Sequence, residues 1–196
     1  MPSTYSIITQ ALQVFSFSSL LSLSLSLSLS LSLFACFVQY PFSQIMERNN
    51  QLHRQVVLSR QSLFDQGFLD EQFLQLEELQ DDANPNFVEE VVTLYYRDSA
   101  RLILNIEQAL ERNPLDFNKL DSLMHQFKGS SSSIGAKKVK AECTLFREYC
   151  RAGNGEGCIR TFQQLKKEYA TLKKKLEAYF QLARQVGPAE TACRPK

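Results

Sequence analysis

The sequence lacks the features that mark several common classes of protein. It has no tryptophan and only 7 glycines and 6 prolines in 196 residues, so turn signals are few. Its 22 Lys and Arg nearly balance its 21 Asp and Glu, and a net charge of +1 argues against binding nucleic acid or a membrane surface by bulk electrostatics. No P-loop or other Gly-rich phosphate loop is present, so we expect no nucleotide site. Leu, Gln, Glu and Lys dominate after residue 46, a composition that favours helices.

The 5 cysteines show no pattern of a metal site or a disulfide framework. They are Cys36, Cys143, Cys150, Cys158 and Cys193, without any C-x-x-C pair. We interpret them as reduced thiols of a cytosolic or nuclear protein. Cys143 and Cys150 would share one helix face, where small core residues are expected. No bound metal is predicted.

Residues 1–45 contain no Asp, Glu, Lys or Arg, and Leu and Ser alternate from Leu21 to Leu33. A signal peptide would need basic residues first, and a membrane span would need about 20 mostly apolar residues. A lone strand would have nothing to pair with. A CT dinucleotide repeat read in one frame also encodes alternating Ser and Leu. We therefore expect this low-complexity extension to be a translated leader, with the physiological start at Met46. If the segment is made, we expect disorder or a weak anchor.

From Met46 onward, apolar residues recur every three or four positions between turn signals, which predicts an all-α domain over residues 46–185 and a flexible tail over 186–196. Short connections between long amphipathic helices predict antiparallel neighbours in a bundle, and no membrane span is expected in 46–196. Six helices are predicted: one ending near Gly67, one from Leu69 to before Asn84, one from Pro85 to before Asn113, and then 116–134, 137–151 and a last helix after Gly155.

The stretch from Met124 to Ala136 carries the candidate chemistry. At ~100° per residue around a helix, one arc of ~120° is apolar and must face the core, and His125 lies ~140° from its centre. The apolar arc consists of Phe117, Leu120, Leu123, Met124, Phe127 and Ile134. We therefore expect an exposed histidine, with Asp121 and Ser122 before it and Lys128, Gly129 and Ser132 after it on the outer surface.

Gly129 and the four serines that follow conflict with the helical pattern. Gly costs about 1 kcal/mol in a helix interior and each Ser about half as much, so the run gives up roughly 3 kcal/mol of helix propensity. Such conflicts concentrate at functional sites. We interpret the run as a surface poor in side chains that lets another protein approach the imidazole of His125.

An exposed neutral imidazole can act as a nucleophile toward phosphorus. Lys128, one turn later, could supply a positive charge to phosphoryl oxygens. Asp121 could hold the second ring nitrogen and fix its tautomer, or could equally point to water. A lone exposed histidine is also an ordinary feature of helices, and His53 is another example that we leave without a role.

The segment from His125 to Gly135, HQFKGSSSSIG, closely resembles the signature of the plant histidine-containing phosphotransfer (HPt) proteins of the multistep phosphorelay. Residues 68–81 and 85–95 are similar to the early helices of the same family, and the likeness extends from Met46 to about Gln185. Residues 1–45 have no counterpart, which agrees with the leader hypothesis. The one departure in the signature is Phe127 where Leu is usual, on the core face, where it should affect packing alone.

The resemblance implies six helices, of which the last four form an antiparallel bundle capped by the first two. It implies that His125 is phosphorylated, that Lys128 assists the phosphoryl group and that Gly129 leaves room for a docked receiver domain. The docking surface would also include Gln126, Ser130, Ser132, Ser133 and Asp121. His125 excludes the relatives that carry Asn at this position and inhibit the relay.

The same resemblance implies the partners and the setting. The donor would be the receiver aspartate of a hybrid sensor histidine kinase and the acceptor a response-regulator aspartate, as in cytokinin signalling in the cytoplasm and nucleus. The protein would be a carrier without ATP-dependent kinase activity and without a cofactor, Mg²⁺ being held by the partner receiver. Two alternatives stay open: a scaffold that binds receivers without phosphorylation, and a membrane-tethered form that keeps residues 1–45.

Overall fold

The computed structural model describes residue 44 and residues 46–186. The predicted extension over residues 1–45 and the predicted tail over 186–196 lie outside the described residues, apart from Gln44 and Val186. The chain divides into two compact units, Met1–Gln51 and Leu52–Lys196. The described residues of the first unit are helical and exposed. The bundle and the candidate site belong to the second unit, and a domain boundary after residue 45 stays a prediction.

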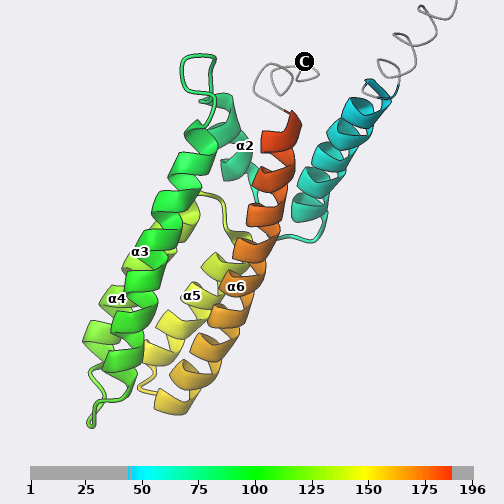
Figure 1. Cartoon of the computed structure of the whole chain (residues 1–196). Helices are drawn as coiled ribbons and strands as arrows, with labels where there is room; N and C mark the ends of the chain where they lie inside the picture. Colours follow the sequence, from blue (N-terminus) through cyan, green and yellow to red (C-terminus); the bar gives the residue numbers. More distant parts are fainter. Residues whose placement is uncertain (1–43, 45, 187–196) are drawn as a thin grey trace, which may run out of the picture. The chain divides into compact units, whose positions relative to one another are not determined.

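The described residues form six helices and no strand, which confirms the predicted all-α class. The first helix ends at residue 65. It is followed by α2 (Glu71–Glu78), α3 (Phe87–Leu110), α4 (Phe117–Ser133), α5 (Lys137–Arg151) and α6 (Gly155–Val186). Figure 1 shows α3 to α6 alongside one another with alternating direction, so the predicted antiparallel four-helix bundle is confirmed.

Local signals explain where these helices begin. Asp70 and Asp116 cap α2 and α4, because each side chain accepts a hydrogen bond from a backbone N–H in the first turn, at 3.0 Å in both cases. Asn154 caps α6 in the same way through Gly157 N at 2.8 Å. Gly155 is therefore the first residue of α6, whereas we had expected the turn to include it.

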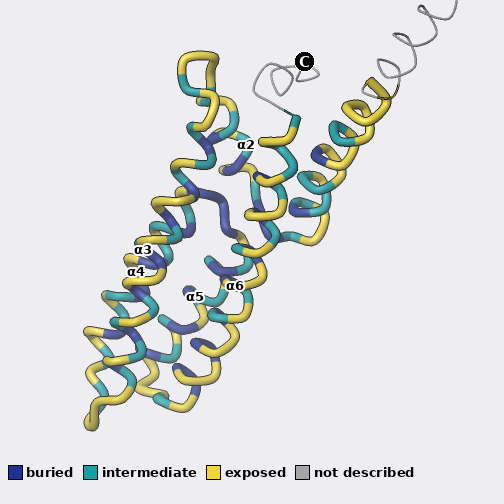
Figure 2. The backbone as a smooth tube through the Cα atoms, viewed as in Figure 1, coloured by how far each residue is buried: buried dark blue, intermediate teal, exposed yellow. Residues whose placement is uncertain are grey.

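The core lies between the four long helices, and buried positions line their inner faces (Figure 2). Four of the six residues predicted for the core face of α4 are fully buried: Leu120, Met124, Phe127 and Ile134. The other two, Phe117 and Leu123, are partly buried against the same core. Full burial of such a side chain contributes about 1.5–3 kcal/mol. The apolar face of α4 thus fixes its rotation in the bundle.

Three of the cysteines lie within the described part of the chain, and all three are buried and free. Cys143 and Cys150 on α5 occupy the core positions that the spacing predicted. The Sγ atoms of Cys150 and Cys158 lie 3.7 Å apart, which joins α5 to α6. Burial raises the pKa of the Cys143 thiol to about 12, so it is protonated at neutral pH.

Ion pairs join the second unit's part of the first helix to α2, and the loop before α2 to α5. Arg60 forms a salt bridge with Glu77 on α2, and Asp70 forms one with Lys140 on α5 at 2.6 Å. Asp70 also donates its backbone N–H to the Gly135 carbonyl at 2.9 Å, beside an isolated β-bridge between Leu69 and Ala136. These contacts hold the turn between α4 and α5 in place. None of the helices in the described residues is long and apolar enough to cross a membrane.

Candidate functional site

His125 lies on the outward face of α4. Met124 and Phe127, its neighbours on the helix, are fully buried, whereas His125 and Gln126 are exposed. The core face of α4 therefore turns the imidazole outward, as the periodicity predicted. This position leaves the ring open to a second protein.

Arg147 on α5 contacts the histidine ring. Its Nη1 atom lies 3.0 Å from His125 Nδ1. A guanidinium is always a donor and never an acceptor, so Nδ1 accepts this hydrogen bond. The second ring nitrogen, Nε2, receives no hydrogen bond from the described residues. One edge of the imidazole is thus held by α5, and the other edge is available.

Asp121 orients Arg147. Its two carboxylate oxygens accept from Arg147 Nε at 2.8 Å and Nη2 at 3.0 Å, the two-pronged geometry that a guanidinium and a carboxylate favour. The Arg147 hydrogen bond lowers the pKa of Asp121 below its ordinary value of 3.8, and the same bond raises the pKa of Arg147. Asp121 is therefore ionised at neutral pH, and Arg147 keeps its charge.

The expectations for Asp121 are corrected by this arrangement. We had expected its carboxylate either to hold the second ring nitrogen of His125 or to point to water. It binds Arg147, and Arg147 binds the ring. The pairing of α4 with α5 decides this outcome, because it places a strong cationic donor within reach of the carboxylate.

Arg147 is not among the site residues that the sequence predicts. Its position carried a signal, since it lies four residues after Cys143 and three before Cys150, at the edge of the apolar stripe of α5. A residue at that edge faces a neighbouring helix. The sequence could not show that the neighbour is the histidine-bearing face of α4.

Lys128 lies one turn after His125 and is half-buried beside α5. Its positive charge lowers the pKa of the Cys143 thiol, against the larger effect of burial. Within the described residues, the Lys128 ammonium takes part in no salt bridge. The side chain can therefore offer its charge to an incoming anion near His125, the role that the sequence suggested.

Gly129 is exposed, and nothing inside the chain requires a glycine there. A Cβ atom built on it would meet no atom within 4 Å, and its φ is not positive. The helix could therefore carry an alanine at this position and would gain stability from it. The missing side chain leaves an open surface one turn from His125.

The four serines do not share one face of α4. Ser131 is buried, and its hydroxyl lies 3.4 Å from that of Tyr95 on α3. The hydroxyl of Ser132 donates to the Lys128 carbonyl at 2.8 Å, and that of Ser133 to the Ser130 carbonyl at 2.7 Å. Hydroxyls that bind their own helix protrude little. The hydroxyls of Ser132 and Ser133 therefore protrude little, Ser130 is half-buried, and Ser131 belongs to the core.

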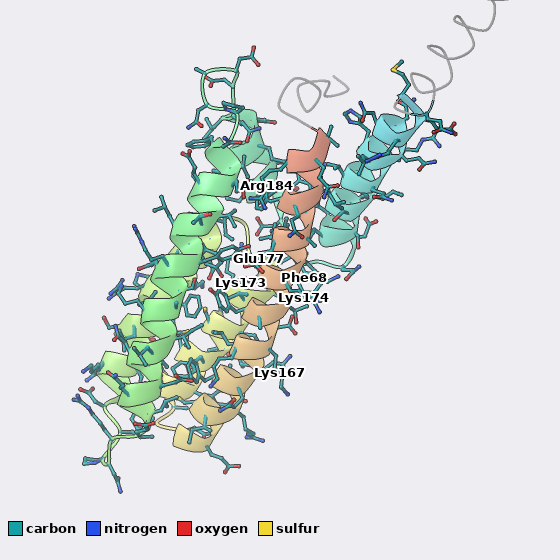
Figure 3. All side chains as sticks on the ribbon, viewed as in Figure 1. Phe68, Lys167, Lys173, Lys174, Glu177 and Arg184 are labelled. Atoms are coloured by element: carbon teal, nitrogen blue, oxygen red, sulfur yellow. The ribbon has the colours of Figure 1, made fainter. Side chains whose placement is uncertain are left out.

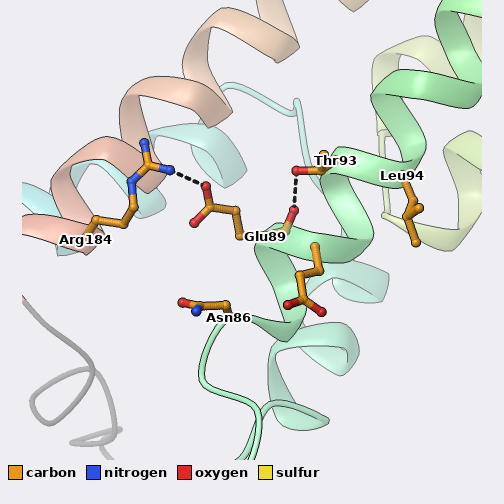
Figure 4. Close-up of a pocket in the computed structure, with 6 residues that line it drawn as sticks. Asn86, Glu89, Thr93, Leu94 and Arg184 are labelled. Carbon is orange, nitrogen blue, oxygen red and sulfur yellow. Dashed lines mark hydrogen bonds and ion pairs between the residues drawn. The ribbon is translucent and has the colours of Figure 1, made fainter.

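Other polar groups of the described residues offer no comparable site. No three His, Cys, Asp or Glu side chains among them lie together as metal ligands would. A depression between α3 and α6 contains Glu89 and Arg184, which already form a salt bridge at 2.6 Å (Figure 4). Figure 3 shows Lys167, Lys173 and Lys174 along α6, and the Lys173 ammonium lies over the Tyr96 ring. His125, the predicted phosphorylated residue, contacts a cation, because Arg147 lies against its ring.

Comparisons with known proteins agree with this picture. The family described as Hpt domain matches residues 90–175. Histidine-containing phosphotransfer protein 4 of Arabidopsis thaliana is 80% identical over 116 residues, which cover 59% of this chain and 91% of that protein. Pseudo histidine-containing phosphotransfer protein 5 of rice, Oryza sativa subsp. japonica, is 59% identical over 150 residues, which cover 76% of this chain and 98% of the relative.

Solved structures give the same result. The crystal structure of the histidine-containing phosphotransfer protein MtHPt2 from Medicago truncatula matches with a TM-score of 0.67 and 46% identity, over 74% of this chain and 96% of that one. The crystal structure of ZmHP2 from maize matches with a TM-score of 0.66 and 41% identity, over 69% of this chain and 99% of that one.

Proposed function

This chain belongs to the histidine-containing phosphotransfer proteins of plants, and on that basis we propose that His125 carries a phosphoryl group between receiver domains. The donor is the receiver aspartate of a hybrid sensor histidine kinase, and the acceptor is the receiver aspartate of a response regulator. The protein is a carrier that does not use ATP. We place this relay in cytokinin signalling, in the cytoplasm and nucleus.

One observation supports the proposal most strongly: an exposed histidine lies beside a glycine that the interior does not need. A Gly that lowers helix stability without relieving a clash or a strained turn has no benefit inside the chain. Its benefit must lie outside, where a receiver domain could bring its active-site aspartate close to the ring. Gln126, Ser130, Ser132 and Ser133 would line the same docking surface.

The two proteins supply the atoms between which the phosphoryl group moves. The lone pair of Nε2 attacks the phosphorus of the aspartyl phosphate, and the bond between phosphorus and the carboxyl oxygen breaks. The electron pair leaves on the aspartate carboxylate. Lys128 lies where it can stabilise the charge on the phosphoryl oxygens. In the proposed relay, Mg²⁺ belongs to the partner receiver, and this chain holds no cofactor.

The proposal is tested by transfer from a purified, phosphorylated receiver domain to the full chain. We expect label that is labile in acid and stable in base, the behaviour of a phosphohistidine, and we expect it to move on to a second receiver. His125→Gln should take up no label while keeping its helical circular dichroism spectrum. Equal labelling of His125→Gln would refute the site.

A scaffold that binds receivers without phosphorylation is the alternative function. It is favoured by the rice relatives of 58%, 59% and 63% identity, all named pseudo histidine-containing phosphotransfer proteins. A scaffold would bind a receiver equally well before and after His125→Gln and would acquire no label in either form. Binding and labelling measured on the same samples therefore separate the carrier from the scaffold.

A further inference from the structure

The three side chains Asp121, Arg147 and His125 form a connected series across α4 and α5. Asp121 holds the Nε and Nη2 edge of the guanidinium, and this leaves Nη1 to reach the ring. Arg147 is mostly covered, with 18% of its side chain exposed. The carboxylate thus fixes the guanidinium plane, and the plane determines where Nη1 points.

The hydrogen bond from Arg147 decides the tautomer of the resting ring. Nδ1 accepts from Nη1, so its lone pair is in use and it carries no proton. In a neutral imidazole, the proton must then be on Nε2. Nε2 faces outward but has no lone pair to offer in this state. The resting arrangement positions the correct nitrogen and at the same time keeps it unreactive.

We propose that Arg147, oriented by Asp121, holds resting His125 in its Nε2–H tautomer, and that it leaves Nδ1 to bind the phosphoryl oxygens when a phosphoryl group arrives. This inference rests on the proposed function, because it assumes transfer at His125. It adds that the histidine is inactive until a partner's phosphoryl group draws Arg147 away.

The move of Arg147 from the histidine ring to the phosphoryl group has a physical cause. A phosphoryl dianion is a far stronger acceptor for a guanidinium than a neutral ring nitrogen. Once the whole guanidinium leaves Asp121 and Nδ1 and binds the phosphoryl oxygens, water can carry the proton from Nε2 to Nδ1. The freed lone pair of Nε2 forms the bond to phosphorus while the aspartate carboxylate leaves with its electron pair. Nδ1 keeps the proton, so the step neither consumes nor releases one.

Nitrogen NMR of the unphosphorylated full chain tests the resting state at a pH where the ring is neutral. We expect His125 to show a protonated Nε2 and a hydrogen-bonded, unprotonated Nδ1. Arg147→Met removes the donor, so the Nδ1 resonance should move and the Nδ1–H form should gain population. Asp121→Asn should move the Nδ1 resonance in the same direction by a smaller amount. Arg147 stays in this variant, but the carboxylate no longer holds its guanidinium in the orientation that reaches the ring.

Arg151→Met is the matched control, since it removes the same charge one turn further along α5 from a side chain that has no hydrogen bond with the ring. It should leave both ring resonances in place. Identical ring resonances in the wild type and Arg147→Met would overturn the inference. A shift of equal size in Arg151→Met would also overturn it, because the effect would then be one of general charge.

The kinetics of phosphoryl transfer test whether Arg147 acts on the reaction after it leaves Nδ1 of His125. Arg147→Met should lower the maximal rate of phosphoryl uptake about tenfold, because the lost positive charge on the phosphoryl oxygens outweighs the larger share of the reactive Nδ1–H form. The half-saturating receiver concentration should change by less than about twofold. Arg147→Lys keeps a charge but cannot bind Asp121 and the ring together, so it should recover part of the rate without restoring the ring resonances. An unchanged maximal rate in Arg147→Met would refute the role in transfer.

The two proposals fail in different ways. If the wild type takes up no label from the receiver, the proposed function is wrong. If the wild type is labelled on His125 and the ring resonances ignore Arg147, only the positioning role is wrong.

Discussion

Gly129 and Gly135 lie close together at the end of α4, yet a side chain added to each would meet different surroundings. At Gly135, φ is +69°, and an added Cβ would lie 2.6 Å from Asp70 Oδ1 and 2.8 Å from the Phe73 nitrogen. At Gly129, φ is not positive, and the added atom would meet nothing within 4 Å. Gly135 is required by the fold, whereas Gly129 is not.

This contrast separates two kinds of constraint on one segment of sequence. The turn at Gly135 lets the loop before α2 lie against the junction of α4 and α5. The surface at Gly129 borders His125. Glycine weakens the helix at this position, and no contact within the fold requires it. Where internal packing explains one glycine and cannot explain its neighbour, the neighbour points to a binding partner.

The largest effect on stability is expected at the buried glycine. Gly135→Ala should lower the free energy of unfolding by about 2–4 kcal/mol, because it combines a strained φ with overlap against backbone. Gly67→Ala is the matched control, since φ there is +67° but an added Cβ has open space. It should cost about 1–2 kcal/mol. Chemical denaturation measures both, and equal losses would mean that the close approach to Asp70 and Phe73 contributes nothing.

The next largest effect concerns the rate of transfer. Lys128→Ala should slow phosphoryl uptake about tenfold, because it removes a charge that stabilises the phosphoryl oxygens. Stability should change by no more than about 0.5 kcal/mol, since Lys128 has no salt-bridge partner among the described residues. Single-turnover transfer measures the predicted loss of rate, and circular dichroism during denaturation measures the stability. Loss of the helical spectrum would show that Lys128 is structural.

Gly129→Gln tests the exposed side of the comparison directly. The free energy of unfolding of the variant should be about 0.5–1 kcal/mol higher than that of the wild type, because Gln is the better helix former. Its half-saturating receiver concentration should rise about tenfold, equivalent to about 1.4 kcal/mol of lost docking. Gly129→Ala, with a smaller side chain, should gain similar stability with a smaller loss of docking. Unchanged docking in both variants would show that the surface is not used.

The smallest effect is the pH dependence that Asp121 contributes. Because Arg147 lowers the pKa of Asp121 in the folded state, the pair stabilises the fold above the ordinary Asp value of 3.8. That contribution is lost as pH falls through the lower, folded-state pKa. The difference in melting temperature between the wild type and Asp121→Asn should therefore be constant near neutrality and shrink in acid. A difference that grows in acid would contradict the sign of the shift.

Much of α4 could be predicted from sequence because its apolar residues recur at helical spacing. That spacing determines which side is buried, and with it the exposure of His125. It could also have placed Ser131, seven residues after Met124, on the core face, although the serine run looked like one surface. In such cases the information is local to one helix.

The remainder of the site depends on how the helices pair. The contact between Arg147 and His125 exists only because α5 lies against α4, and no spacing within either helix reports it. The sequence does not report what an added side chain would meet at Gly129, inside α4, or at Gly135, in the turn after it. Asp70, far away along the chain, distinguishes them.

Locating the phosphate after transfer tests the central claim most directly. The full chain would be loaded from a phosphorylated receiver, digested at neutral pH and fragmented by electron transfer, which preserves phosphohistidine. We predict phosphate on His125 and on no other residue of the peptide that contains it. Phosphate on one of the serines from Ser130 to Ser133, or none on His125 in a fully loaded sample, would contradict the account.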